Sequence, residues 1–244
     1  MNRLLIIFSL IIIFVFPAYA GFWDDVKKEL KGAVQDGGGK DEKGLSDETV
    51  IAGLKEALDV GTKKAVEKVS KLDGYYRNPQ ITIPFPPKIE KTAKALKKIG
   101  LEKEVDRFVL SMNRAAERAA PKAVDIFVGE IRKMSFSDAR KILTGNDTAA
   151  TEFFRSKTSS ELSALFRPAV SGAMNEVGVT RNFKKLMNKY ASLPFVKEEY
   201  VDLDGYVTEK ALEGLFLMVG EEEKKIRKDP LARSTELLKQ VFGK

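Results

Sequence analysis

Three arginines form the pattern in this sequence that most directly suggests chemistry. They are spaced i, i+7 and i+11 within one predicted helix: Arg107, Arg114 and Arg118. At this spacing the side chains share one helix face of about three turns, and stacked guanidinium groups suit phosphate or carboxylate recognition. With the adjacent Asn113 they form a candidate anion-binding site. The alternative is structural, because Glu104, Glu117 or acids on neighbouring helices could pair with the arginines.

Two acidic stretches are weaker candidates. In "DLDG", a calcium loop with Gly205 in sixth place would need an oxygen ligand at Tyr200 and a Glu at Ala211. Both ligands are missing, so Asp202 and Asp204 are predicted to cap a helix. In "GEEEKKIRKDP" acids and cations fall at i, i+4, which predicts a solvated helix end rather than a carboxylate cluster.

The absence of two residue types excludes most familiar chemistries. The chain has no His and no Cys, so the usual ligand sets for zinc, copper, haem and iron–sulfur clusters cannot form, and neither can Ser-His-Asp or Cys-His catalytic groups. P-loop, G-x-G-x-x-G, G-x-S-x-G and S-x-x-K motifs are absent as well. We therefore assign no catalytic residue, no metal site and no cofactor. Carboxylate, Lys, Tyr, Ser or Thr chemistry remains.

A helical framework must position these residues. Apolar residues recur at helical spacing through most of the chain, which predicts an all-α, bundle-like fold. The expected helices cover residues 46–72, 88–99, 102–120, 122–134, 137–143, 147–155, 159–177, 204–228 and 234–242. Ser46 and Asp204 are predicted N-caps, and Pro168 is a predicted bend. Gly100 and Gly178 lie in similar strings, which predicts two helix–Gly–helix corners.

One stretch, "NPQITIPFPP" at 78–87, is predicted to be extended. Its large apolar residues alternate with polar residues and prolines and share one face: Ile81, Ile83 and Phe85. Prolines lack a backbone N–H, so a central strand is excluded and an edge strand or a strap remains. We expect a structural strap that seals a groove between helices, with a brief pairing to Glu199–Leu203 as an option. Ile83→Asp should then unfold the protein and Thr82→Asp should be mild, unless the stretch is an exposed recognition edge.

The N-terminus has the layout of a secretory signal peptide. Arg3 is followed by an apolar run and by "PAYA", whose small residues are placed for cleavage before Gly21. The run is shorter than the roughly 18 to 20 residues that span a bilayer, although a retained anchor is the alternative. We expect a signal peptide at 1–20, a short amphipathic helix and Gly-rich linker at 21–44, and one helical domain at 45–244.

Export and charge together narrow the choice of partners. The chain has 42 Lys and Arg against 35 Asp and Glu, a formal net charge of +7. A moderately basic exported protein suits an anionic membrane surface, whereas export separates it from nucleic acid. We expect a periplasmic or secreted protein with no transmembrane segment after cleavage, and with an envelope protein or a small ligand as its partner.

Several longer strings give the chain a family resemblance. They are "NPQITIPFPP", "LSMNRAAERAAP", "ARKILTGNDTAATEFFRSKTSSEL", "FRPAVSGAMNEVG" and "DGYVTEKALEGLFLMVGEEEKKIRKDPLARSTELLKQVF". In this order they resemble the bacterial exported family catalogued as domain of unknown function 4197, over about residues 45–242. The resemblance implies a helical envelope protein and brings no activity or catalytic residue. Some members are lipoproteins, but this chain has no Cys, so a soluble periplasmic protein is the expectation.

Two functional interpretations follow. The first is a non-enzymatic periplasmic or envelope-associated protein that binds a partner, an apolar ligand or an anionic ligand. The alternative is a metal-independent hydrolase or lyase that uses carboxylate, Tyr or Lys chemistry in a cleft. Five aromatic residues could line an apolar cavity, although aromatics at helical spacing are more often core: Phe153, Phe154, Phe166, Phe183 and Phe216. A pocket with several unpaired carboxylates would favour the enzyme.

Overall fold

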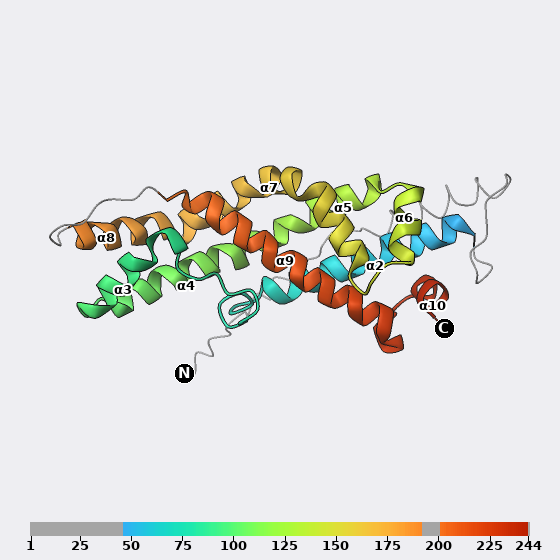
Figure 1. The fold of residues 1–244 in the computed structure, drawn as a ribbon, viewed down its shortest axis with the longest axis horizontal. Coiled ribbons are helices and arrows are strands. Elements are labelled where there is room, and N and C mark those ends of the chain that lie inside the picture. Colours follow the sequence, from blue (N-terminus) through green and yellow to red (C-terminus); the bar gives the residue numbers. More distant parts are fainter. Residues whose placement is uncertain (1–45, 192–200, 244) are drawn as a thin grey trace, which may run out of the picture. The chain divides into compact units, whose positions relative to one another are not determined.

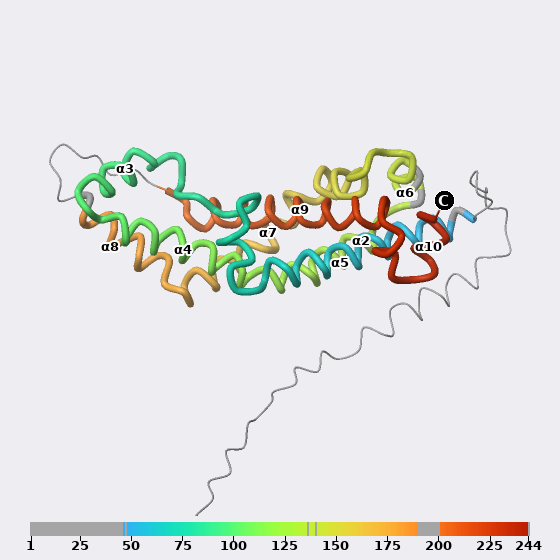
Figure 2. Tube along the Cα trace, turned by 90° about the horizontal axis from the view of Figure 1, so that it is seen from below, coloured from blue at the N-terminus to red at the C-terminus, as the bar shows by residue number. Residues whose placement is uncertain are grey.

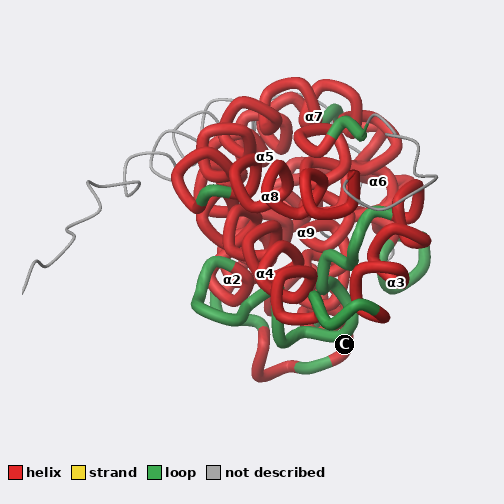
Figure 3. The backbone as a smooth tube through the Cα atoms, turned by 90° about the vertical axis from the view of Figure 1, so that its left-hand side faces the viewer, coloured by secondary structure: helices red, strands yellow, loops and turns green. Residues whose placement is uncertain are grey.

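Helices make up nearly all of the described structure (Figure 1). The computed structural model describes residues 46–191 and 201–243, all of which fall within the compact unit Lys40–Lys244. The predicted signal peptide, amphipathic helix and linker lie outside the described residues. No β-strand occurs in 46–191 or 201–243, and the end-on view in Figure 3 shows helices joined by loops. The predicted all-α fold is confirmed.

The helices follow one another with short connections. In chain order they are α2 (Asp47–Val69), α3 (Glu90–Lys98), α4 (Glu102–Ala119), α5 (Ala123–Lys133), α6 (Phe136–Leu143), α7 (Ala149–Val177), α8 (Val179–Ala191), α9 (Leu203–Lys228) and α10 (Glu236–Phe242). Short 3-10 turns are η1 (Pro87–Ile89), η2 (Ala120–Lys122) and η3 (Pro230–Ala232). Ser46 caps α2 by accepting from Thr49 N at 3.3 Å, as predicted. The cap of α9 is Asp202, which accepts from Gly205 N at 2.9 Å, rather than Asp204.

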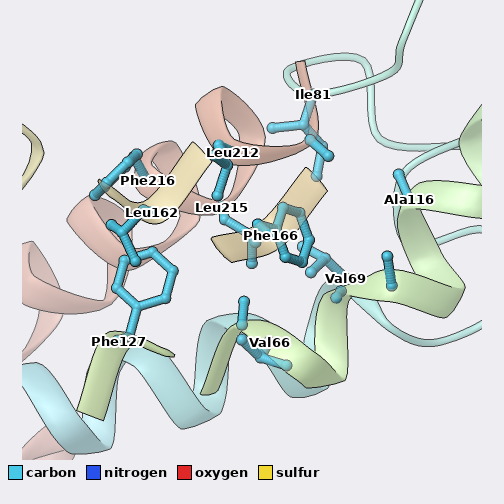
Figure 4. Packing of buried hydrophobic residues seen from close by; sticks show 14 of the residues in the cluster. Val66, Val69, Ile81, Ala116, Phe127, Leu162, Phe166, Leu212, Leu215 and Phe216 are labelled. Atoms are coloured by element: carbon cyan, nitrogen blue, oxygen red, sulfur yellow. The ribbon is translucent and has the colours of Figure 1, made fainter. Parts of the chain in front are cut away.

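The core forms where α2, α4, α7 and α9 pack on one another (Figure 2). Figure 4 shows the ring of Phe127 of α5 directed toward Leu162 of α7 and Phe216 of α9, and Leu215 of α9 beside Phe166 of α7. Of the five aromatic residues singled out in the sequence, Phe154, Phe166 and Phe216 are buried, and the other two pack against the cluster from its edge. These aromatics therefore belong to the packed core. Each fully buried side chain of this size contributes roughly 1.5 to 3 kcal/mol.

The first described helix, α2, contacts the last two, α9 and α10. Gly53 makes the contact with α10 possible, because a Cβ there would lie 2.4 Å from Val241 Cγ2. A side chain at this position would push α10 away from α2. The two ends of the domain are thus held against each other.

The two predicted glycine corners are both present. Gly100 ends α3 with φ of 85°, and Gly178 ends α7 with φ of 76°. Such left-handed backbone favours glycine and closes a helix by returning N–H groups to its last carbonyls. At the first corner Leu101 N donates to Leu96 O at 3.0 Å. The corners turn the chain from α3 into α4 and from α7 into α8.

Helix α7 differs from the prediction of two helices at 147–155 and 159–177. It is continuous over Ala149–Val177 and includes Pro168. In the polar run between the two predicted helices, hydroxyl groups donate to carbonyls of the preceding turn, as Thr158 Oγ1 does to Phe154 O at 2.6 Å. The buried face Phe154, Thr158 and Leu162 continues across the predicted break. Tertiary burial overrode the local sequence signal.

The stretch 78–87 is less extended than predicted. Ile81 N and Thr82 N both donate to Asn78 O, at 3.1 and 2.8 Å, so its first half is a turn. The predicted burial pattern holds, since Ile81 and Ile83 are buried. Phe85 packs edge-on against Phe108 with ring centroids 5.3 Å apart. The segment Glu199–Leu203, which was an option for pairing with this stretch, forms no strand where the structure describes it. Leu203 begins α9, and Glu199 lies outside the described residues.

Two close approaches seat this strap. Asn113 of α4 binds the backbone of Ile83 in both directions: Ile83 N donates to its Oδ1 and its Nδ2 donates to Ile83 O, each at 2.9 Å. Gly214 of α9 lets the strap lie close, because a Cβ there would be 3.0 Å from Ile81 Cβ. The strap therefore crosses between α4 and α9, and Ile81 points toward Leu212 in Figure 4.

Thr82 is more constrained than its alternation with buried residues predicts. Its hydroxyl lies 2.6 to 3.0 Å from the carbonyl oxygens of Tyr75, Tyr76 and Asn78. A carboxylate at this position would face three acceptors. We therefore correct the expectation that Thr82→Asp is mild: it should destabilise the strap.

The end of α9 is not the solvated helix end predicted from its charges. Glu222 and Glu223 are buried. Glu223 accepts from Ala150 N at 3.0 Å, from Thr151 N at 2.9 Å and from Thr151 Oγ1 at 2.7 Å, and it pairs with Arg227 at 2.9 Å. This carboxylate satisfies the first N–H groups of α7 from a helix more than 70 residues away. The i, i+4 pair of Glu223 and Arg227 exists, but it lies inside the protein.

Candidate functional site

The three arginines singled out in the sequence line one hollow. The hollow has a volume of about 500 Å³ and lies where α4 faces the corner between α7 and α8 and the loop that follows α2. Its lining residues are Ser70, Leu72, Arg107, Leu110, Ser111, Arg114, Glu117, Arg118, Val177 and Asn182. The helical spacing thus brought the three side chains to one place. Each of them has a different environment there.

Arg114 is held by two carboxylates. Its Nη2 is 2.5 Å from Asp73 Oδ1 and its Nη1 is 2.6 Å from Glu117 Oε2. Burial disfavours the charge of Arg114, but these hydrogen bonds outweigh burial and raise its pKa. Glu117 is buried and also accepts from Tyr75 N and Tyr76 N, at 3.1 and 3.2 Å. Arg114 therefore pairs with carboxylates, as the structural interpretation predicted, and it anchors the loop after α2.

The loop needs this anchor because of Asp73. Asp73 has φ of 68°, a left-handed conformation that is uncommon for residues other than glycine. Its carboxylate contacts Arg114 on one side and Arg77 at 3.1 Å on the other. The loop conformation that sets Leu72 at the rim of the hollow is thus fixed by charged hydrogen bonds.

Arg118 has an exchangeable partner. Its Nε is 2.5 Å from Glu176 Oε2, and both side chains are more than half exposed, at 63% and 57%. Exposed ion pairs contribute between about 0 and 1 kcal/mol. An incoming anion could replace Glu176 at little cost.

Arg107 is exposed, and in the part of the chain that the structure describes it makes no hydrogen bond or ion pair with a carboxylate. The nearby Glu104 is held by Lys189 at 2.7 Å. The hydrogen bond from Lys189 lowers the pKa of Glu104, and the charge of Arg107 adds a smaller effect in the same direction. Of the three predicted arginines, Arg107 is therefore the one most available to a ligand.

Asn113 lies apart from this hollow. It is fully buried, and its amide also donates to Val109 O at 2.9 Å in addition to its two bonds with Ile83. It is absent from the residues that line the hollow. Its contacts are those of a residue that positions the strap.

Two neighbouring hollows extend the first along α8. One, of about 440 Å³, is lined by Glu104, Arg107, Asn182, Lys185, Leu186, Asn188 and Lys189. The next, of about 380 Å³, is lined by Asn175, Gly178, Thr180, Arg181, Lys184, Lys185 and Asn188. Arg107 and Asn182 belong to the first two hollows, and Lys185 and Asn188 to the last two, so the three are contiguous.

We call this surface the α4–α8 basic face. Its cations are Arg107, Arg114, Arg118, Arg181, Lys184, Lys185 and Lys189. Within the described residues, Arg181, Lys184 and Lys185 have no hydrogen bond or ion pair with a carboxylate. The hollow nearest Gly178 has no acidic residue in its lining. Cations thus outnumber carboxylates along this face.

The sequence of α8 explains how the face forms. Val179 and Leu186 are buried, and Phe183 packs on Phe108 of α4 with ring centroids 5.3 Å apart. The cations Arg181, Lys184, Lys185 and Lys189 lie at other, exposed positions of the helix. The α8 cations were missed because only tertiary packing brings them beside Arg107. A signal was available: residues 177–197 contain five Lys or Arg and no Asp or Glu.

The acids that line the described hollows are occupied. Glu104 pairs with Lys189, and Glu117 pairs with Arg114. A separate hollow of about 220 Å³ between α7 and α9 is lined by Glu152 and Glu221, and Glu221 pairs with Lys224 at 2.8 Å. Glu152 accepts from Thr148 Oγ1 at 2.6 Å. Among the described residues no three acidic side chains gather as a metal site. Each of these carboxylates thus has a cation or a hydroxyl group as its partner.

Two tyrosine hydroxyl groups, one buried and one partly buried, donate hydrogen bonds to backbone carbonyls. Tyr75 is fully buried and donates to Ala211 O at 2.7 Å, and burial raises its pKa above the ordinary value. Tyr206 donates to Pro84 O at 3.1 Å, and burial raises its pKa to about 12. Both phenols stay protonated and serve as hydrogen-bond donors to backbone carbonyls.

Within residues 46–191 and 201–243 no helix combines the length and the apolar character needed to cross a membrane. A family model described as "Protein of unknown function (DUF4197)" matches residues 44–243. No curated protein and no solved structure matches the chain. The match extends over most of the sequence, so the chain belongs to the DUF4197 family.

Proposed function

We propose that this member of the DUF4197 family is an exported, non-enzymatic binding protein whose α4–α8 basic face receives an anionic partner. One observation carries the proposal. Three contiguous hollows share a lining in which Arg107, Arg181, Lys184 and Lys185 have no carboxylate partner among the described residues. Elsewhere many described cations have a carboxylate within 4 Å, as Lys68, Lys133 and Arg167 do, and the cations without one do not line adjoining hollows of this kind.

The physical basis is the field of like charges. Cations that line adjoining hollows raise the local positive potential, which attracts anions and increases their association rate. The field falls off over a Debye length of about 8 Å at physiological ionic strength. A partner with several negative charges gains most, because it can contact more than one hollow at once.

Export supports the choice of partner. The signal-peptide layout of residues 1–20 predicts delivery to the cell envelope, where anionic headgroups are abundant and nucleic acid is not the natural ligand. Determining the N-terminus of protein isolated from the periplasm should yield Gly21. Recovery of the complete chain from the cytosol would overturn the export proposal and would make nucleic acid a partner to test.

The binding proposal is tested with a charge-reversed α8. The variant Arg181→Glu/Lys184→Glu/Lys185→Glu is compared with Lys91→Glu/Lys122→Glu/Lys141→Glu, which changes net charge equally at exposed residues outside the three hollows. Affinity for inorganic polyphosphate is measured by calorimetry at several salt concentrations. We expect the α8 variant to bind at least about tenfold more weakly, with a reduced salt dependence.

The control decides what the result means. The control variant should lose less than about threefold in affinity, because its charges act from a distance and are screened. An equal loss in both variants would show a response to net charge alone, and would overturn the assignment of the binding surface to α4 and α8.

A further inference from the structure

We propose that the 500 Å³ hollow is a binding site for an anionic amphiphile, with its acidic headgroup on Arg107 and its aliphatic tail along Leu72, Leu110 and Val177. This inference rests on the proposed anion-binding function and names the ligand class of one part of the face. The other two hollows take no part in it.

The lining has two chemical halves. Arg107 and the side-chain amide of Asn182 can hold a phosphate or carboxylate, whereas three aliphatic side chains line the same space. A site for a bare inorganic anion would not need an apolar half. The volume lies within the range of about 300 to 1,000 Å³ that is typical of small-molecule sites.

Leu72 supports the assignment of the tail. It is 77% exposed, and a single exposed leucine is ordinary on a protein surface. This one, however, lines the hollow and precedes Asp73, whose left-handed conformation is fixed by Arg114. Because the loop is held in place before any ligand arrives, a tail that covers Leu72 gains burial with little ordering cost.

The charges identify where the headgroup binds. Arg114 is committed to Asp73 and Glu117, so it contributes structure. Arg107 has no carboxylate partner among the described residues, and Arg118 can release the exposed Glu176. Arg118 lies 11 residues further along α4, about 16 Å from Arg107 along the helix axis, so one acidic headgroup binds at Arg107.

Three probes separate the two halves of the ligand. Decyl phosphate carries both, glycerol phosphate carries the acidic headgroup alone, and decyl glucoside carries a neutral head with the same tail. Binding to the full mature chain is measured by calorimetry below the critical micelle concentrations. We expect decyl phosphate to bind at least about tenfold more tightly than either partial probe, since both charge pairing and tail burial contribute. Equal affinity for decyl phosphate and glycerol phosphate would overturn the amphiphile assignment.

Two single substitutions with matched controls locate the site. Leu72→Ser is compared with Leu231→Ser, which alters a leucine that is 93% exposed on η3. Arg107→Gln is compared with Lys103→Gln, an exposed cation of the same helix that does not line the hollow. We expect Leu72→Ser and Arg107→Gln each to weaken decyl phosphate binding at least about fivefold, and the controls to stay within about twofold. All four positions are exposed, so unchanged melting temperatures should accompany these effects.

The source of the amphiphile is a separate arm of the experiment. Vesicles of phosphatidylglycerol in neutral lipid present the same chemistry in a membrane, whereas monomeric decyl phosphate presents it free. Binding of monomers, weakened by Leu72→Ser, supports the hollow whichever source supplies the ligand in the cell. Vesicle binding without monomer binding would overturn it in favour of surface docking. This outcome would not change polyphosphate binding or its loss in the α8 variant. The amphiphile proposal and the proposed anion-binding function can therefore fail independently.

Discussion

Glu223 and Lys185 each carry one charge on a helix, yet their surroundings differ completely. Glu223 is buried and accepts from two backbone N–H groups, a threonine hydroxyl and Arg227. Lys185 is exposed, lines two hollows and has no carboxylate partner among the described residues. A buried carboxylate such as Glu223 holds helices together, because its hydrogen bonds to protein groups replace the hydrogen bonds that it would make with water. An exposed cation without a carboxylate partner, such as Lys185, can form an ion pair with another molecule.

A buried carboxylate with no partner should have the largest effect. Ile83→Asp would place a charge where the native side chain is fully buried on the strap. Unlike Glu223, the new carboxylate would have no hydrogen-bond donors placed to pair with it. We therefore expect the variant to lose its cooperative unfolding transition. Circular dichroism during heating tests this. Gln80→Asp, at an exposed position of the same strap, should unfold normally. A native melting temperature for Ile83→Asp would show that the strap is not part of the core.

Removing the charge of a well-bonded buried carboxylate should have the next largest effect. Glu223→Gln leaves Arg227 without its carboxylate partner and weakens the cap of α7. Breaking such a pair costs roughly 3 to 5 kcal/mol, which corresponds to a melting temperature about 10 °C lower for a domain of this size. The control is Glu221→Gln, two residues earlier in α9, where the carboxylate is partly exposed and pairs with Lys224. Its loss should stay below about 1 kcal/mol.

The strap offers an intermediate case. Thr82→Asp replaces a hydroxyl donor by an acceptor that faces three carbonyl oxygens. We expect a loss of about 1 to 3 kcal/mol in chemical denaturation. Thr82→Ser keeps the donor and should lose less than about 1 kcal/mol. Equal stabilities of the Asp and Ser variants would mean that these hydroxyl contacts do not hold the strap.

Acid should reduce the stability that the buried carboxylates contribute, and should leave the exposed cations charged. Burial opposes the charge of Glu222, but hydrogen bonds from Lys68 and Lys225 outweigh burial and lower its pKa. A depressed pKa contributes stability above the ordinary Glu value of about 4.3, and this contribution is lost as pH falls through the folded-state pKa. The difference in unfolding free energy between the wild type and Glu222→Gln should therefore shrink on acidification. A difference that is constant from about pH 7 to pH 3 would contradict the assignment.

The exposed cations should have the smallest effect on stability. Lys184→Gln/Lys185→Gln removes like charges that have no described partner, so we expect the unfolding free energy to change by less than about 0.5 kcal/mol. Polyphosphate affinity should nevertheless fall. If these substitutions destabilised the fold by several kcal/mol, the α8 cations would be structural and the contrast with Glu223 would disappear.

Features that depend on neighbours in the sequence were predictable. The Ser46 cap, the two glycine corners and the pairing of Arg114 with Glu117 all involve residues within a few positions of each other. Their geometry follows from helix periodicity and backbone sterics. The same periodicity placed three arginines along one hollow.

Features that depend on tertiary packing were not predictable. Asn113 reaches Ile83 across 30 residues, and Glu223 reaches Thr151 across 72. No local pattern distinguishes these side chains from solvated ones, since Asn and Glu are ordinary residues on helix surfaces. The α8 half of the basic face also required packing, because Phe183 must dock on Phe108 before Lys185 can adjoin Arg107.

The contact of α2 with α9 and α10 has a consequence for the order of folding. The first described helix, α2, packs on α5 and α6, but it also packs on α9 and α10 in residues 203–242, and Glu223 of α9 completes the start of α7. During synthesis the earlier helices therefore emerge without the surfaces that cover them. Contacts of such long sequence separation also slow folding, because the intervening chain must be ordered first. The core cannot close until nearly the whole polypeptide has been made.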